Sequence, residues 1–312
     1  MKKFLLSLSA AFKKTISNSL KTCKWIVQLT VIVSFAILLL DYFQILPYIS
    51  SALQPIFNFV GLPGGAALAY VSGYFVNVYS AIAVAVTLDL NFRELTILGA
   101  MVLAAHNMII ETAVQKKTGT SAILILLVRT LSSVVLGLGL NLLLPEAAES
   151  VGPVAAAVME GDFLSMFKEW GLSTLFLALK MCVIICTLNL LQELMAVYGV
   201  IRILSKILRP VLAFFGLPAK TALLWIVANV IGLAYGATAM IEESRSGKLK
   251  KEEVDMLNIH ISLSHSNLED LLLFTSIGGI WWAILLSRWT VSLILVWSYR
   301  LIKKISYLCK SK

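Results

Sequence analysis

Long apolar runs, separated by short polar or charged segments, follow one another along most of this chain of 312 residues. The hydrocarbon core of a bilayer requires about 20 apolar residues per helix. Because the runs are continuous rather than alternating, they favour helices over membrane strands. They predict spanning helices at about 25–46, 66–87, 121–144, 172–199, 221–241 and 280–299. Shorter apolar runs at 49–60 and 203–215 have the length of helices that lie in the membrane interface.

The composition agrees with this pattern, since 59% of the residues are hydrophobic and only 14% are charged. A soluble domain of this length carries far more charge. The sequence therefore predicts an all-α polytopic membrane protein in contact with the lipid bilayer. The net charge of +9 is concentrated at the chain ends, where basic residues orient membrane proteins, so it implies no nucleic-acid partner.

The chain contains an internal repeat. At an offset of 155 residues, Gly61-Leu62-Pro63 matches Gly216-Leu217-Pro218, each time at the end of a short apolar helix. Beyond a longer loop in the second copy the offset becomes 159, and three ionisable residues recur in the same order. His106 matches His265, Glu111 matches Asp270, and Arg129 matches Arg288.

Charge predicts how the two repeats are oriented. The positive-inside rule assigns the basic clusters to the cytoplasm and the acidic segment 145–171 to the outside, so the first repeat crosses an odd number of times. The repeats are then inverted. An arm of ten helical residues is about 15 Å long and reaches the midplane. We therefore expect 94–117 and 254–277 to be re-entrant helical hairpins that turn near His106 and His265.

These expectations divide the chain into a basic amphipathic segment on the cytoplasmic surface, a first repeat, an acidic extracytoplasmic linker, a second repeat and a basic cytoplasmic tail. In that order, the parts are residues 1–24, 25–144, 145–171, 172–299 and 300–312. The predicted location is an inner membrane of the bacterial type, with both termini in the cytoplasm. The sequence leaves a homo-oligomer open.

The repeated ionisable residues are the main functional clue. A charged side chain at membrane depth costs about 2.5–3.5 kcal/mol on insertion scales, so each one needs a partner. Acids and arginines that neutralise one another would form a structural ion-pair lattice; a substrate or ion site at the helix breaks is the alternative that we favour. The candidate residues are His106, Asn107, Glu111, Arg129, His265, Asn267, Asp270 and Arg288.

Within this set, two histidines and two carboxylates have the ligand types of a transition-metal site. The metal candidates are His106, Glu111, His265 and Asp270. The same acid–histidine pairs are equally suited to relaying protons. Beyond such a bound cation, the sequence predicts no cofactor.

Four further polar residues are candidates for the lining of a cavity. Tyr79 and Tyr235 match each other at an offset of 156, one residue later in register, and ordinary packing would also account for them. Gln192 and Glu193 correspond to apolar residues of the first repeat, so they either break the symmetry of the site or hydrogen-bond another helix.

The segments Ala104–Thr112 and Leu263–Asp270, each between apolar helices, resemble the Gate or nucleoside-recognition domain. That domain is shared by concentrative nucleoside transporters, FeoB-type ferrous-iron transporters and the spore maturation proteins. The resemblance covers about 30–300 and implies two gate units. We expect them to move a nucleoside-like solute, a metal cation or an organic anion through a central polar site at the repeat interface.

We expect a transport protein rather than an enzyme, because the chain has no Walker A sequence, no dinucleotide glycine fingerprint and no His-Glu-x-x-His. Two alternatives stay open. One is an intramembrane enzyme that uses the same histidines, acids and arginines, and the other is a membrane subunit of a larger assembly that transports nothing itself.

Overall fold

A computed structural model gives the fold and describes residues 2–146, 163–245 and 247–310. Within these residues the chain forms helices and no strand. Five helical segments are long and apolar enough to cross a membrane: 15–42, 92–117, 122–143, 163–197 and 281–309. The predicted class, an all-α polytopic membrane protein, is confirmed.

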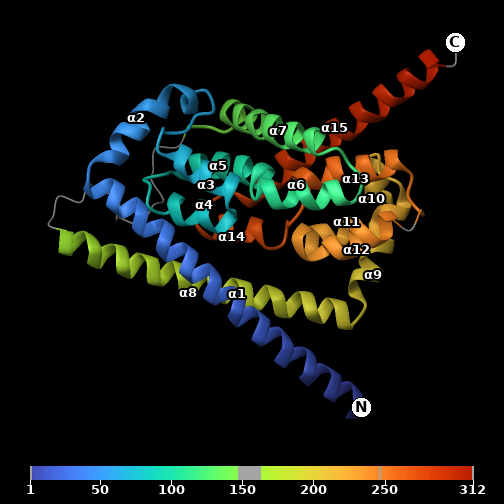
Figure 1. The fold of residues 1–312 in the computed structure, drawn as a ribbon, viewed down its shortest axis with the longest axis horizontal. Coiled ribbons are helices and arrows are strands. Elements are labelled where there is room, and N and C mark those ends of the chain that lie inside the picture. Colours follow the sequence, from blue (N-terminus) through green and yellow to red (C-terminus); the bar gives the residue numbers. More distant parts are fainter. Residues whose placement is uncertain (1, 147–162, 246, 311–312) are drawn as a thin grey trace.

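Two long helices, α1 (Lys2–Tyr42) and α8 (Phe163–Val197), cross one another along one face of the molecule (Figure 1). Their aromatic residues meet, with the ring centroids of Phe35 and Trp170 5.1 Å apart. Two boundaries differ from the prediction. Residues 2–42 form one helix, which no proline or glycine interrupts, so the predicted boundary after residue 24 is not a break in the helix. The predicted linker becomes helical at Phe163, and its residues 147–162 lie outside the described part.

Each long helix leads into a short helical segment near the predicted interfacial position. In the first repeat this is α2 (Ile45–Asn58), and in the second it is the pair α9 (Val200–Ile207) and α10 (Arg209–Phe214). The repeated Gly-Leu-Pro then turns the chain. Gly61 and Gly216 have φ of 70° and 74°, a left-handed conformation that glycine adopts without steric cost.

A helical hairpin follows each turn, in place of the spanning helix that was predicted there. In the first repeat α3 (Ala66–Phe75) and α4 (Val78–Ala85) fold back on one another. The two ends of this hairpin therefore lie side by side: a Cβ placed on Gly65, just before α3, would be 3.3 Å from the side chain of Leu88, just after α4. In the second, α11 (Ala222–Val230) and α12 (Leu233–Arg245) bring Lys220 to within hydrogen-bond distance of the carbonyl of Lys248, 3.0 Å away. Neither arm of the first hairpin spans a bilayer, because ten residues of helix are only about 15 Å long.

The predicted re-entrant hairpins are, by contrast, broken helices that continue in one direction. In the first repeat α5 (Phe92–Ala105) and α6 (Met108–Lys117) pack along the straight helix α7 (Ala122–Leu143). Arg93 at the start of α5 donates to the carbonyl of Asn141 at 2.8 Å, whereas α6 ends next to the start of α7. The two ends of the 92–117 segment therefore lie a helix length apart. The prediction of re-entrant hairpins at 94–117 and 254–277 is wrong. In each repeat the hairpin is formed by the preceding segment, for which a spanning helix was predicted, and the segment predicted as a hairpin is the broken helix.

The second repeat repeats this plan in the opposite direction. Its broken helix, α13 (Lys251–Ser264) and α14 (Asp270–Ser276), packs on α15 (Trp281–Lys310). Thr120, just beyond α6, bonds Asp255 near the start of α13, and the N–H of Ile280, beyond α14, donates to Thr96 near the start of α5. The two broken helices are therefore antiparallel, as an inverted repeat requires.

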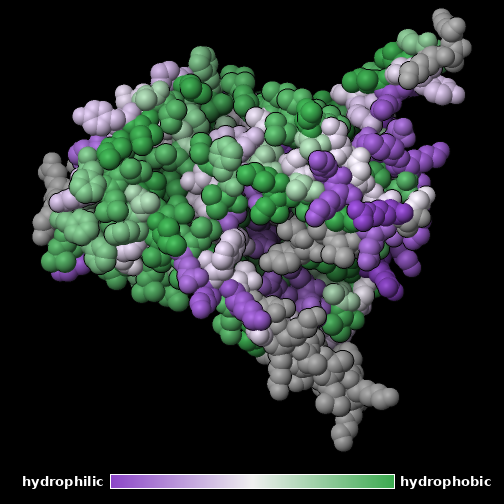
Figure 2. Space-filling model, viewed as in Figure 1, coloured by the Kyte–Doolittle hydropathy of each residue, from purple (hydrophilic) through white to green (hydrophobic). Residues whose placement is uncertain are grey.

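The molecule has two chemically different ends. The first, called the basic end here, holds the end of α6 with Lys116 and Lys117 and the start of α13 with Lys250 and Lys251. Figure 2 shows hydrophilic side chains gathered at this end, whereas the surface around α2 is mainly hydrophobic. The chain ends project from the molecule on the side of the basic end (Figure 1).

Candidate functional site

The two helix breaks share one backbone design. Asn107 and Ser266, the residues after the repeated histidines, have φ of 49° and 52° and so interrupt the helical backbone. The N–H of Asn107 donates to the carbonyl of Gly73 at 2.9 Å, and that of Ser266 donates to the carbonyl of Ala228 at 3.0 Å. Each break is therefore held by the hairpin of its own repeat, which satisfies a backbone donor that has no helical partner.

The repeated arginines bond the carbonyl groups that each break leaves free. Arg129 Nε donates to the carbonyl of Ala104 at 3.0 Å, and its Nη2 donates to that of His106 at 2.6 Å. Arg288 makes the equivalent bonds to Leu263 at 2.5 Å and His265 at 2.8 Å. Both side chains are fully buried. A cation at a helix C-terminus is favourable because the helix dipole is negative there.

Glu111 and Asp270 lie on the other side of the breaks, in the first turns of α6 and α14, where the helix dipole favours an acid. Glu111 Oε2 lies 2.9 Å from Arg129 Nη2. Asp270 differs, since no ion pair joins it to Arg288 although the structure describes both residues; its Oδ2 instead lies 3.2 Å from His106 Nε2. The predicted acid–arginine pairing thus occurs in one repeat only.

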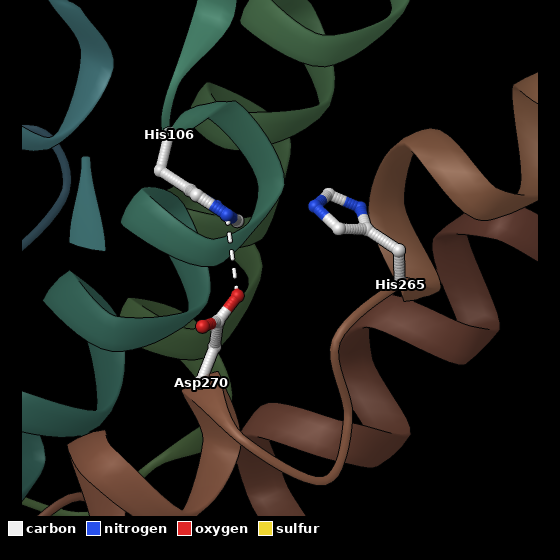
Figure 3. Close-up of side chains that lie close together, drawn as sticks. All are labelled: His106, His265 and Asp270. Atoms are coloured by element: carbon white, nitrogen blue, oxygen red, sulfur yellow. Dashed lines mark ion pairs between the residues drawn. The ribbon is translucent and has the colours of Figure 1, made fainter. Parts of the chain in front are cut away.

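The histidines of the two repeats meet at the crossing of the broken helices. Their rings stack with centroids 5.0 Å apart, and both are buried. Figure 3 shows His106 and His265 approaching each other from different elements, with Asp270 beside His106. Glu111 touches both, with 3.4 Å from its Oε1 to His106 Nε2 and 3.0 Å from its Oε2 to His265 Nε2. We call His106, Glu111, His265 and Asp270 the central cluster.

The hydrogen bonds of His265 determine its tautomer when the ring is neutral. Its Nδ1 lies 2.7 Å from the carbonyl oxygen of Ile261, which only accepts, so Nδ1 carries a hydrogen. Nε2 then presents a lone pair toward the carboxylate of Glu111. Neither His265 Nε2 nor Glu111 Oε2 has a partner with hydrogen-bond geometry, although both atoms are buried. Arg129 Nη2 already lies 2.9 Å from Glu111 Oε2, and a hydrogen or a metal ion at His265 Nε2 would make the contact of the histidine with the carboxylate favourable as well.

The cluster offers a set of ligand atoms to a cation. One atom from each of His106, His265 and Asp270 lies within 4.8 Å of the others. Imidazole suits several first-row metals, and the bond from Nδ1 of His265 to a backbone carbonyl is the usual way of orienting a metal-binding histidine. Glu111, the fourth predicted ligand, contacts both histidines but is not among the three mutually close groups.

The other predicted site residues lie around the cluster. Asn267 connects Arg288 to α11, because it accepts from Nη1 of Arg288 at 3.2 Å and donates to Asn229 at 2.6 Å. Asn107 contributes its backbone at the first break. Tyr79 on α4 donates to Glu269, next to Asp270. The side chain of its repeat mate Tyr235 lies outside the described residues.

Gln192 and Glu193 lie away from the central cluster, in a pocket between α1 and α8 that Ile231 also lines. Gln192 donates to the carbonyl of Val230 at the tip of the second hairpin, 2.7 Å away. Of the two explanations given for Gln192, a hydrogen bond to another helix is the one observed.

Two polar residues at the site were missed. Glu269 bonds Tyr79, and Asn229 bonds Asn267. Comparison of the repeats hides Glu269, since its equivalent at an offset of 159 is Ile110. Asn229 carried a signal as an amide inside an otherwise apolar run.

Comparison with known proteins gives one informative relative. No protein-family profile and no solved structure matches the chain. Over 299 residues it is 30% identical to the uncharacterized membrane protein YvoD of Bacillus subtilis (strain 168), and the match covers 95% of this chain and 93% of YvoD. The chain is therefore a membrane protein that belongs to the same family as YvoD.

Proposed function

We propose that this protein transports a small cation across the membrane and that the central cluster is the site that carries it. The observation behind the proposal is the meeting of two histidines and two acids from inverted broken helices. The half-helices α5, α6, α13 and α14 have 14, 10, 14 and 7 residues and are therefore about 10–21 Å long, which brings the breaks toward the middle of a bilayer core of about 30 Å. Broken helices of inverted repeats that meet near the midplane are the usual setting of substrate and ion sites in secondary transporters.

The charges favour a cation over an organic anion. The guanidinium groups that would hold an anion already bond backbone carbonyls at the breaks. The remaining groups of the cluster, imidazole nitrogens and carboxylate oxygens, are electron donors. Contact between Glu111 and His265 without a hydrogen bond fits a proton or a metal ion bound between acceptors.

Among cations, the donor set fits a first-row divalent metal best. Two imidazoles with one or two carboxylates are typical of manganese, iron and zinc sites, whereas magnesium and calcium favour oxygen ligands alone. His106, His265 and Asp270 would hold the ion. Proton movement is the second candidate, since the same pairs would accept and release protons.

The architecture also supports the proposed kinship with Gate-type transport proteins. In each half an interfacial segment is followed by a hairpin, a broken helix and a straight spanning helix. By the positive-inside rule we propose that the basic end faces the cytoplasm of a bacterial inner membrane.

Flux into proteoliposomes tests the proposal. The vesicles would contain a metal-sensitive or a pH-sensitive dye, and Mn²⁺, Fe²⁺ or Zn²⁺ would be added outside. We expect metal uptake by the wild type and none by the double variant His106→Gln/His265→Gln. The matched control is His260→Gln, because His260 is buried in the same helix as the site but bonds Ser264 and Trp225 instead.

Three results would redirect the proposal. Acidification without metal uptake would identify the cation as the proton. Equal metal flux in the wild type and in the double variant would remove the central cluster from the transport path. No flux of either cation, together with chemical conversion of an added solute or with a stably bound partner protein, would favour the enzyme or the membrane subunit instead.

A further inference from the structure

A row of buried polar residues joins α6 to α13 between the central cluster and the basic end. On α13 the members recur every three or four residues, and so they lie on one face of the helix. On the other side Gln115 belongs to α6, Thr118 is the residue that ends this helix, and Thr120 lies in the turn just beyond it. The row consists of Asp255, Asn258 and Ser262 on one side and Gln115, Thr118 and Thr120 on the other. We call these six residues the polar seam.

Hydrogen bonds across the seam connect its members. Gln115 Nε2 donates to the carbonyl of Asn258 and to Ser262 Oγ, both at 3.0 Å. Asn258 Nδ2 lies 2.7 Å from the hydroxyl oxygens of Thr118 and Thr120. Thr120 in turn donates to Asp255 at 2.8 Å. All six residues are buried, at 6% exposure or less.

The seam extends from the central cluster to the surface. At its inner end Gln115 is one helical turn from Glu111, and Ser262 is one turn from His265. At its outer end Asp255 lies 2.6 Å from Lys251, whose side chain is 57% exposed. The seam is therefore a polar row between a buried ionisable site and solvent.

The equivalent interface at the opposite end of the molecule is mainly apolar; among the counterparts of the seam residues only Thr96, which matches Asp255, is polar, and it accepts from the N–H of Ile280 at 2.9 Å. At the offset of 159, Gln115, Thr118, Asn258 and Ser262 correspond to Phe274, Ile277, Gly99 and Leu103. Where Gln115 bonds Asn258, Phe274 packs on Gly99 so closely that a Cβ there would lie 2.9 Å from its ring. The same backbone arrangement is thus held together there with Thr96 as the single polar counterpart, so the fold does not require a continuous row of polar side chains.

Helix adhesion is a weak explanation for the seam. Hydrogen bonds between membrane helices contribute only about 0.6 kcal/mol each on average. One acceptor of the seam, Asn258 Oδ1, is buried and has no hydrogen-bond partner. Such an atom is costly in a dry interface but is satisfied when water or an ion enters.

We infer that the polar seam is the route by which the cation passes between the central cluster and the basic end, and that α6 and α13 separate to open it. The inference rests on the proposed transport of a cation. A carboxylate lies near each end of the seam, Asp255 at the solvent end and Glu111 at the end next to the central cluster, and hydroxyl and amide groups lie between them. Such groups can replace part of the hydration shell of a cation. The apolar interface of Phe274 and Gly99 closes the other side in this structure.

Accessibility of single cysteines tests the route without any knowledge of the substrate. Cys23, Cys182, Cys186 and Cys309 would first be changed to serine. Ser262→Cys and its repeat-matched control Leu103→Cys would then be labelled with a charged methanethiosulfonate added to either face of sealed vesicles. Lys117→Cys, at the basic end, identifies which face is which.

We expect Ser262→Cys to react from the face that labels Lys117→Cys and from that face only, while Leu103→Cys stays unlabelled from it. A folded Ser262→Cys protein that reacts from neither face would overturn the route, and equal labelling of Ser262→Cys and Leu103→Cys would do the same. Labelling and flux are separate measurements. Labelling without flux would contradict the proposed transport function but support an aqueous path along the seam. Flux without labelling would support transport but contradict this path.

Discussion

The two broken helices are alike at their centre and different toward their ends. At the centre each break has a left-handed residue, a bond to a hairpin carbonyl and an arginine on two freed carbonyls. Toward the basic end the helices meet through hydrogen-bonded polar side chains, and toward the opposite end through Phe274, Gly99 and Leu103. Symmetry thus holds where the backbone needs support, and it is lost where the composition of the interface is free to vary.

This difference distinguishes buried polar residues that support the backbone at both breaks from buried polar residues that the shared backbone does not require. The arginines recur in both repeats because both breaks leave the same carbonyl groups without partners. The polar seam has only Thr96 as a polar counterpart in the other interface, so the shared backbone arrangement does not by itself require the row. In an inverted repeat, the positions at which the copies disagree are therefore informative about function.

The largest expected effect comes from the symmetric part. Arg288→Ala or Arg129→Ala leaves freed carbonyls unbonded at membrane depth, and Arg129→Ala also leaves Glu111 without its counter-charge. We expect a loss of about 3–5 kcal/mol, seen as loss of folded protein in size-exclusion chromatography after detergent extraction. Normal yield and melting temperature for both variants would contradict the structural role.

The double variant Glu111→Gln/Arg129→Gln sharpens this expectation. It removes the uncompensated charge, so folded yield should recover relative to Arg129→Gln alone, while cation flux stays absent because Glu111 belongs to the central cluster. Recovery of full flux would mean that the pair is only structural.

The next effect concerns the asymmetric part. Gln115→Phe with Asn258→Gly and Ser262→Leu gives the polar seam the residues of the apolar interface at equivalent positions, including the glycine that makes room for the phenylalanine ring. We expect flux at the level of protein-free vesicles with folded yield retained, because the introduced side chains remove the donors and acceptors along the route. Phe274→Tyr in the opposite interface is the comparison variant. Flux close to wild type in the triple variant would show that the cation takes another path.

A smaller effect is expected where the apolar interface is tightest. Gly99→Ala places a methyl group 2.9 Å from Phe274 and 3.0 Å from Ile284, and should cost about 1–3 kcal/mol. Gly139→Ala is the control, because a Cβ there meets nothing within 4 Å, and it should be neutral or slightly stabilising. Thermal melting in detergent measures both. Equal melting temperatures would mean that the interface has room that the structure does not show.

The smallest effect is expected at the breaks themselves. Ser266→Gly should stabilise the protein by less than about 1 kcal/mol, because serine is strained at φ of 52° and glycine is not. Asn107→Gly should gain less, since asparagine tolerates the left-handed conformation better. Melting temperatures in detergent test this order, and a lower value for Ser266→Gly would indicate that its side chain has a role at the break.

Much of this arrangement was predictable from the sequence, and the errors have physical causes. The apolar runs predicted the helical membrane class, and the matched ionisable residues predicted the breaks at His106 and His265. Hairpin and span were exchanged because the charges predicted an odd number of crossings in the first repeat but did not reveal which segment turns back. The ionisable residues of 94–117 made it the candidate, whereas the entirely uncharged segment 66–87 is the one that turns back. The tip at Val76–Asn77 has no glycine or proline at the turn, and its local signal, Asn77 as the N-cap of α4, is a weak one inside an apolar run.

The partners of the arginines could not be predicted. Charge suggested acids, whereas the freed carbonyls of the breaks provide most of the partners, and those depend on backbone geometry. The polar seam did leave a signal, because Gln115 and Phe274 differ sharply at equivalent positions. This signal comes from positions at which the two repeats differ, whereas the central cluster was predicted from positions at which the two repeats agree.

Binding of a metal ion to the purified protein tests the central claim most directly. Isothermal titration with Mn²⁺ or Zn²⁺ should give one site in the wild type and in His260→Gln, and none in His106→Gln/His265→Gln. Binding should weaken as the pH falls, because imidazole must be deprotonated to bind a metal. Equal binding by the wild type and the double variant, or no binding by the wild type, would contradict the assignment of the central cluster as a metal site.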